Sequence, residues 1–280
     1  TAKLSKFRAV NEIVFVKDKK TKNKILNSII TLVLNNKLFQ DNSFVEKELK
    51  NSNYIFVNCK KLSMSCDYEK LGSKLFDYLK KNKIENSYID INKIDINHIQ
   101  LEKILHGAQL KSYNFNIYKS DKNKDLDINL NVVGNNFKKT NLLRNKLNAL
   151  LGGIFFTRDL VSEPGNILHP DEYAKRIVKL RKFGLKVTVY NQKKLKKLGM
   201  NALLGVGQGS IRGSYLVTVE WNGAKNNSKP LAFIGKGVCF DTGGYSLKPA
   251  RFMEDMTYDM AGSAAVVGLM KTLALRKAKV

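Results

Sequence analysis

The sequence has few cysteines and no long apolar run. Its three cysteines are scattered and form neither a disulfide framework nor a Cys-x-x-Cys metal clip. No stretch reaches the roughly 18 uninterrupted apolar residues of a membrane span. The N-terminal stretch "TAKLSKFRAVNEIVFVKD" has no apolar core of a secretory signal. These absences favour a reducing, cytoplasmic setting without a membrane partner.

Histidine is also scarce. His98, His106 and His169 are isolated, and none belongs to a His-Glu-x-x-His motif. We therefore expect structural or surface histidines and no histidine-based metal centre. Cys239 has no activating group in its sequence neighbourhood, so we expect a small buried residue instead of a reactive thiolate.

Acidic residues are half as frequent as basic ones: 24 Asp and Glu stand against 49 Lys and Arg, which gives a net charge of +25. Such a charge suits a nucleic-acid or acidic-membrane partner. Lysine, however, accompanies asparagine and isoleucine along the chain, as in "NKILNSIITLVLNNK", a composition that AT-rich coding sequence produces. Because the basic residues form no arm or aromatic-interleaved patch, we favour compositional bias over a nucleic-acid partner.

Apolar residues make up 43% of the chain, which is enough for a core. Their spacing predicts strands at 10–17, 53–58, 86–91 and 126–133, a mixed apolar segment at 24–36, and helices at 67–83 and 96–115. Strands that alternate with helices predict an N-terminal α/β domain over residues 1–138.

A long helix is expected at 142–166, ended by Pro164 and Gly165, and it places a connecting segment at 139–166. A second α/β domain is expected over residues 167–280. Its predicted elements are helices at 169–184, 191–200 and 260–278, and strands at 185–190, 202–210, 214–221 and 230–237.

Two glycine-rich stretches follow predicted strands. The first, "GVGQGS" (205–210), invites a nucleotide-binding interpretation, but Ser210 stands where the dinucleotide fingerprint needs its third glycine. The second, "GKGVCFDTGG" (235–244), places Lys236 and Asp241 at the expected end of a strand, where open α/β sheets have their active sites. Its glycines allow a tight loop.

Lys248 and Asp259 follow within "YSLKPARFMEDMTYDMAGSAAVVG". Carboxylates on a rigid backbone bind hard or borderline divalent cations. A lysine can join them as a ligand only when its amine is neutral. A second, charged lysine could stabilise an oxyanion. The alternative is a solvated loop with ordinary ion pairs, and spacing alone leaves both interpretations open.

This segment resembles the first metal-binding block of the leucyl aminopeptidase (cytosol aminopeptidase) family of dimetal exopeptidases. "TRDLVSEPGNILHPDEYA" and "LGMNALLGVGQGS" resemble the family's upstream segments, so the likeness covers residues 103–280 well and the first hundred in outline. It implies an α/β fold: an N-terminal macro-like α/β domain, a long connecting helix, and the first part of an α/β metallopeptidase catalytic domain.

The resemblance also implies roles. Lys236, Asp241 and Asp259 match metal ligands, with Asp241 shared by two ions, which are Zn²⁺ or, at one site, Mn²⁺ or Mg²⁺. Lys248 matches the catalytic lysine near the substrate carbonyl, and Met256 matches a residue of the pocket for the first side chain. The implied enzyme is a cytoplasmic homohexamer that releases N-terminal, leucine-type residues from peptides by a metal-activated water.

The sequence departs from the family at one point. The family's second block, Asn-Thr-Asp-Ala-Glu-Gly-Arg, is absent, and with it two carboxylate ligands and the arginine that holds a bicarbonate in the full-length protein. We therefore expect a partial chain of a larger protein, and we expect the 280 residues alone to be inactive. The alternative is a degenerate relative that serves as a nucleic-acid-binding or structural protein.

Overall fold

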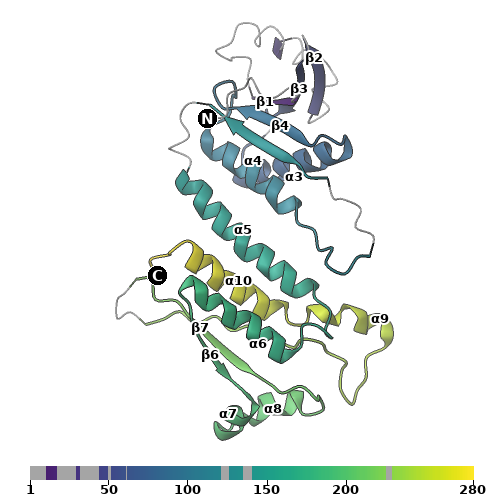
Figure 1. Cartoon of the computed structure of the whole chain (residues 1–280), viewed down its shortest axis with the longest axis vertical. Coiled ribbons are helices and arrows are strands. Elements are labelled where there is room, and N and C mark those ends of the chain that lie inside the picture. Colours follow the sequence, from purple (N-terminus) through teal and green to yellow (C-terminus); the bar gives the residue numbers. More distant parts are fainter. Residues whose placement is uncertain are drawn as a thin grey trace. The chain divides into compact units, whose positions relative to one another are not determined.

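A computed structural model of the chain describes residues 11–17, 30–31, 44–49, 52–60, 62–120, 126–134, 141–224 and 229–280. The chain divides into two compact units, Thr1–Arg144 and Asn145–Val280 (Figure 1). The mixed apolar segment expected at 24–36 lies largely outside the described residues.

The first unit is built on a five-stranded sheet with the order β2-β3-β1-β4-β5. Its strands are β1 (Asn11–Val16), β2 (Phe44–Leu49), β3 (Ser52–Asn58), β4 (Asn86–Asp90) and β5 (Asn129–Val133). All neighbours run parallel except β2, which pairs antiparallel with β3 at one edge. The central strand β1 is apolar and buried along most of its length because both of its faces are covered.

Two helices cover one face of this sheet, α3 (Ser65–Lys81) and α4 (His98–Lys111) (Figure 1). Leu71, Leu75 and Leu79 lie on one side of α3 at helical spacing and are buried against the sheet. On the other face, Val14 and Phe56 pack together with Ile30. The alternation of strand and helix expected for this region is confirmed.

The second unit contains most of the long helix α5 (Asn141–Ser162), followed by α6 (Pro170–Val178) and the 3-10 helix η3 (Lys179–Phe183). His169 caps α6, since its Nδ1 accepts the amide of Glu172 at 3.4 Å, and Pro170 occupies the first helical position. Gly184 ends the segment in the left-handed conformation, with φ +88°.

A two-stranded antiparallel sheet follows, made of β6 (Lys186–Tyr190) and β7 (Leu216–Glu220). Two short helices lie between these strands in sequence, α7 (Gln192–Lys197) and α8 (Asn201–Gly207), and both lie at one end of the sheet (Figure 1). The remaining elements are α9 (Ala250–Met253), the 3-10 helix η4 (Glu254–Tyr258) and α10 (Ala261–Leu275).

The core of the second unit forms between α6, α10 and β6. Its buried members include Tyr173 and Ile177 from α6, Val187 from β6, and Ala264 and Val267 from α10. Helix α5 packs closely on α10. The Thr157 hydroxyl of α5 donates to the carbonyl of Ala264 in α10 at 3.1 Å. The small residues of α10 permit this approach. Within the described residues, no helix combines the length and apolar character needed to cross a bilayer.

Two predicted strands are wrong. Residues 201–207 form helix α8, so "GVGQGS" begins inside a helix and does not follow a strand as a nucleotide-binding loop would. Residues 230–237 have no regular secondary structure, although their composition favours a strand. A strand needs a hydrogen-bonded neighbour, and the sheet of this unit contains only β6 and β7 among the described residues. Leu231 and Ile234 are consequently 80% and 97% exposed.

Candidate functional site

The segment around Lys236 crosses the first turn of α10. The amide of Ser263 donates to the carbonyl of Lys236 at 2.9 Å. This approach requires glycine at position 235, because a Cβ there would lie 2.4 Å from Cα of Ser263. The contact brings Lys236 beside Asp259, which lies just before α10, although the two residues are 23 positions apart.

Lys236 and Asp259 form an ion pair, with Nζ and Oδ1 2.7 Å apart. The hydrogen bond to Asp259 is the main reason why the pKa of the Lys236 ammonium lies above its usual value, and the charges of Asp259 and Asp241 add to it. Lys236 therefore stands near both carboxylates as a cation. It could bind a metal ion only after losing a proton.

The second oxygen of Asp259, Oδ2, is buried and has no hydrogen-bond partner. A buried carboxylate oxygen without a donor is costly, and a bound cation is one arrangement that satisfies it. This atom is the observation in the structure that best fits a metal ligand at this position.

Asp241 lies on a closed turn. The amide of Gly243 donates to Oδ1 at 2.8 Å, and the amide of Lys248 closes the loop by donating to the Thr242 carbonyl at 2.9 Å. Gly243 and Gly244 have φ of +89° and +68°, which side chains other than glycine rarely tolerate. The expectation that glycine allows tight folding here is confirmed.

Lys248 returns from this turn to Asp241. Its Nζ lies 3.0 Å from Oδ2 of Asp241 and 2.9 Å from the sulfur of Met256, which lies in η4. The hydrogen bond from Lys248, followed by that from the Gly243 amide, holds the pKa of the Asp241 carboxyl below its usual value. The five residues singled out in the sequence therefore lie in one connected cluster: Lys236, Asp241, Lys248, Met256 and Asp259.

This cluster offers two carboxylates and one amine to a cation. Among the described residues, no group of three or more His, Cys, Asp and Glu side chains is placed to hold a metal ion. A divalent ion that takes four or more ligands would need donors beyond Asp241, Asp259 and Lys236. The residues fit a part of a metal site.

Several large apolar side chains close to the cluster in sequence are exposed. Leu247 and Phe252 are 69% and 53% exposed, and Tyr245 is fully exposed.

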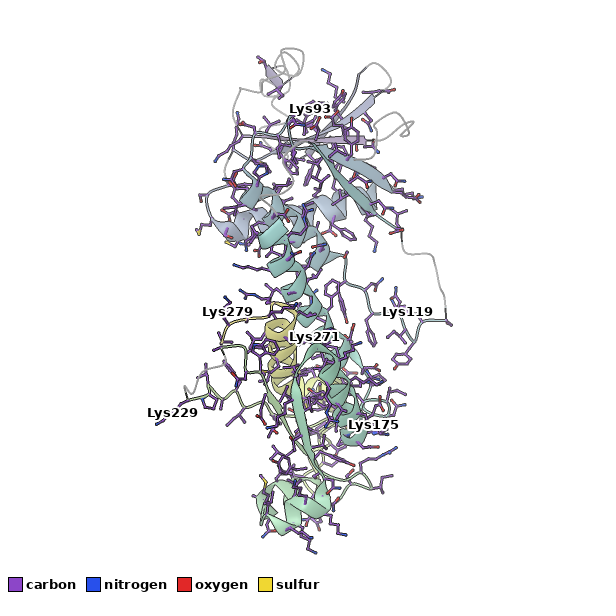
Figure 2. The ribbon with its side chains drawn as sticks, turned by 60° about the vertical axis from the view of Figure 1, so that its left-hand side comes forward. Lys93, Lys119, Lys175, Lys229, Lys271 and Lys279 are labelled. Carbon is purple, nitrogen blue, oxygen red and sulfur yellow. The ribbon has the colours of Figure 1, made fainter. Side chains whose placement is uncertain are left out.

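Lysines are found in both units of the structure. Figure 2 labels six of them, and they come from both units: Lys93, Lys119, Lys175, Lys229, Lys271 and Lys279. The positive charge is therefore carried by both units.

Two residues at the site carry no signal in the sequence, Tyr173 and Ser263. Their hydroxyl oxygens lie 3.0 Å apart, although 90 positions separate them. No local pattern predicts a contact over that separation. His106 is buried in the first unit, where desolvation lowers its pKa.

Comparison with known proteins shows what the second unit is similar to. Residues 155–280 match the sequence profile described as the cytosol aminopeptidase family, catalytic domain. Over these residues, the chain is similar to the catalytic domain of the cytosol aminopeptidase family. The resemblance inferred from the metal-block residues is thereby confirmed.

Curated relatives of the family are similar over a longer stretch. A probable cytosol aminopeptidase of Phytoplasma australiense is 50% identical over 175 residues, which are 62% of this chain and 36% of that protein. One from Agrobacterium fabrum is 41% identical over 218 residues, which are 76% of this chain and 44% of that protein. The chain thus spans less than half the length of these relatives and only a part of the family's catalytic domain.

Solved structures confirm the α/β fold. A mutant of tomato leucine aminopeptidase aligns with a TM-score of 0.70 at 20% identity, over 98% of this chain and 58% of that one. The bottromycin maturation enzyme BotP, solved in complex with Mn, aligns with a TM-score of 0.69 at 21% identity, over 95% and 56%. At this level of identity, the likeness concerns the fold.

Proposed function

We propose that this chain is part of a metal-dependent aminopeptidase that releases N-terminal residues, with a leucine-type preference, from peptides. The observation that carries the proposal is the cluster of Asp241, Asp259, Lys236 and Lys248 on one face, with the buried Oδ2 of Asp259 left without a donor. Similarity to the cytosol aminopeptidase family over residues 155–280 supports the reaction class.

In this proposal, Asp241, Asp259 and Lys236 would contribute ligands to two divalent ions. Divalent ions at such a site supply Lewis acidity, which lowers the pKa of water and polarises a carbonyl group. The Mn complex of BotP supports a divalent ion, and we extend the proposal to Zn²⁺, with Mn²⁺ or Mg²⁺ at one site. Residues of the full-length protein outside the described segments would complete the ligand set and hold a bicarbonate.

Lys248 acts on the substrate directly in this proposal. An ammonium group has three N–H donors, and two of them meet Asp241 and the sulfur of Met256. The third is free to donate to the oxygen of the scissile carbonyl as negative charge develops on it. Met256 lies beside Lys248, so its apolar side chain would contact the first side chain of the peptide, which favours leucine-type residues.

The proposal extends to assembly and location. The relatives carry the name cytosol aminopeptidase, which supports a cytoplasmic enzyme, and the family resemblance supports a homohexamer. The comparisons give no support to the alternative of a degenerate, nucleic-acid-binding relative.

The test measures hydrolysis of leucine p-nitroanilide by the full-length protein, with Zn²⁺ or Mn²⁺ and with a chelator. We expect metal-dependent turnover that Asp241→Ala abolishes and that Glu220→Ala, an exposed carboxylate in β7, leaves unchanged. The 280-residue chain alone should be inactive, because its described residues provide an incomplete ligand set. A folded, metal-loaded, full-length protein without turnover would refute the proposal.

A further inference from the structure

Lys236 is fixed at its main chain as well as at its side chain. Its carbonyl accepts the amide of Ser263, and a Cβ at Gly262 would lie only 3.5 Å from its backbone nitrogen. Asp259 precedes this same turn, four residues before Ser263. The position of Ser263 therefore sets the distance between the backbone of Lys236 and the carboxylate of Asp259, with which the Lys236 ammonium forms its ion pair.

Ser263 is in turn held through its hydroxyl. The Ser263 Oγ donates to the carbonyl of Met260 at 2.8 Å, which uses its single proton. The hydroxyl of Tyr173, 3.0 Å away, must then be the donor in its contact with Ser263. Tyr173 can fill that role over the whole neutral range, because burial raises its pKa to about 12.

Tyr173 also lies against the site segment itself. Its ring edge, Cε1, would be 4.0 Å from a Cβ at Gly237, the residue after Lys236. Tyr173 is only 5% exposed and comes from α6, on a separate element from the cluster. One side chain thus contacts both parts that must stay in register: the start of α10 and the segment that carries Lys236.

We propose that Tyr173 is a positioning residue of the metal site, which acts through Ser263 to hold Lys236 in register with Asp259. The inference rests on the proposed function, since it concerns the same three ligands. The ring of Tyr173 alone would be enough for core packing. The inference gives its hydroxyl a further role, which is to position Ser263.

The two roles separate in the variant Tyr173→Phe, which keeps the ring and removes the hydroxyl. We expect the full-length variant to bind Zn²⁺ about fivefold to tenfold more weakly, the change that loss of one hydrogen bond supports. Binding is measured by competition with a chromophoric zinc chelator. Tyr190→Phe, in β6 of the same unit, is the matched control and should bind Zn²⁺ as the parent does.

A double-mutant cycle tests whether Tyr173 acts through Ser263. Ser263→Ala should weaken Zn²⁺ binding to a similar degree, and adding Tyr173→Phe to it should produce little further loss, because the two hydroxyls form one contact. Amide hydrogen exchange of Ser263 should be faster in both single variants, since its partner is the Lys236 carbonyl.

The outcomes are distinguishable. Failure of the parent protein to bind Zn²⁺ would overturn the proposed metal site and this inference together. Unchanged Zn²⁺ affinity in Tyr173→Phe, with the parent binding normally, would overturn this inference alone and leave the proposed function in place. Additive losses in the double variant would likewise overturn action through Ser263. A lower melting temperature with unchanged affinity would assign Tyr173 to packing.

Discussion

Replacing Gly235 by alanine should destabilise the second unit and displace Lys236. The added Cβ would lie 2.4 Å from Cα of Ser263, 2.7 Å from its nitrogen and 2.8 Å from the carbonyl oxygen of Gly262. All three are backbone atoms at the start of α10 and have no rotamer through which to move away. The segment must shift instead, which breaks the hydrogen bond from Ser263 to the Lys236 carbonyl.

The expected loss of stability combines two unfavourable contributions and one favourable contribution. Overpacking of this kind costs about 1–3 kcal/mol, and the lost hydrogen bond adds about 1 kcal/mol. The smaller entropy of the unfolded alanine chain offsets about 0.4–1 kcal/mol. We expect Gly235→Ala to lower the free energy of unfolding by about 1–3 kcal/mol.

Gly262→Ala is the matched control because it adds a methyl group to the other side of the same contact. Its Cβ would lie 3.5 and 3.8 Å from backbone atoms of Lys236, which is ordinary van der Waals distance. Inside α10, alanine gains about 0.5–1 kcal/mol over glycine. Gly262→Ala should therefore be neutral or stabilising.

The assay is urea unfolding of the 280-residue chain followed by fluorescence of Trp221. This is the only tryptophan, and its Nε1 donates to the carbonyl of Ala278 at 2.8 Å, so its signal reports the second unit. The two variants are compared by their unfolding midpoints and slopes. Equal stability of Gly235→Ala and Gly262→Ala would refute the close approach of the two backbones.

Two further predictions concern helix packing and thiol reactivity. Gly153→Ala should destabilise the chain by about 1–3 kcal/mol in the same assay, because its Cβ would overlap atoms of α10. Gly152→Ala is the control and should leave stability unchanged, because its Cβ would meet only the flexible end of the Leu275 side chain. Under native conditions a thiol reagent should label Cys66 rapidly, because it is exposed, while burial raises the pKa of Cys59 and of Cys239 to about 12; rapid labelling of all three would contradict the burial.

Local patterns in the sequence predict the first unit well because its cores follow the periods of its own elements. The apolar spacing of Leu71, Leu75 and Leu79 places one face of α3 against the sheet. The apolar composition of residues 10–17 predicts a strand, which the structure shows as β1. Strand β2 was missed, because "FVEKEL" alternates weakly and owes its structure to pairing with β3.

The second unit shows where local patterns fail. Residues 230–237 have the composition of a strand, but a strand is a pairing between segments, and composition describes one segment only. Residues 201–207 are apolar and glycine-rich, which suggested a strand, yet they form a helix in which no residue is buried. In both cases the deciding contacts lie outside the segment.

The candidate site also depends on contacts between residues that are distant in sequence. Its residue types and spacing allow a cation site without deciding for it, and the structure brings Asp241 and Asp259 within the electrostatic reach of Lys236. Two neighbouring carboxylates repel each other, and a lysine on each offsets that repulsion. The cluster can therefore form within the chain before any cation binds. A buried oxygen of Asp259 still has no donor, so the lysines do not satisfy it fully. That unsatisfied oxygen supports the proposed cation site over the alternative of a solvated surface with ordinary ion pairs.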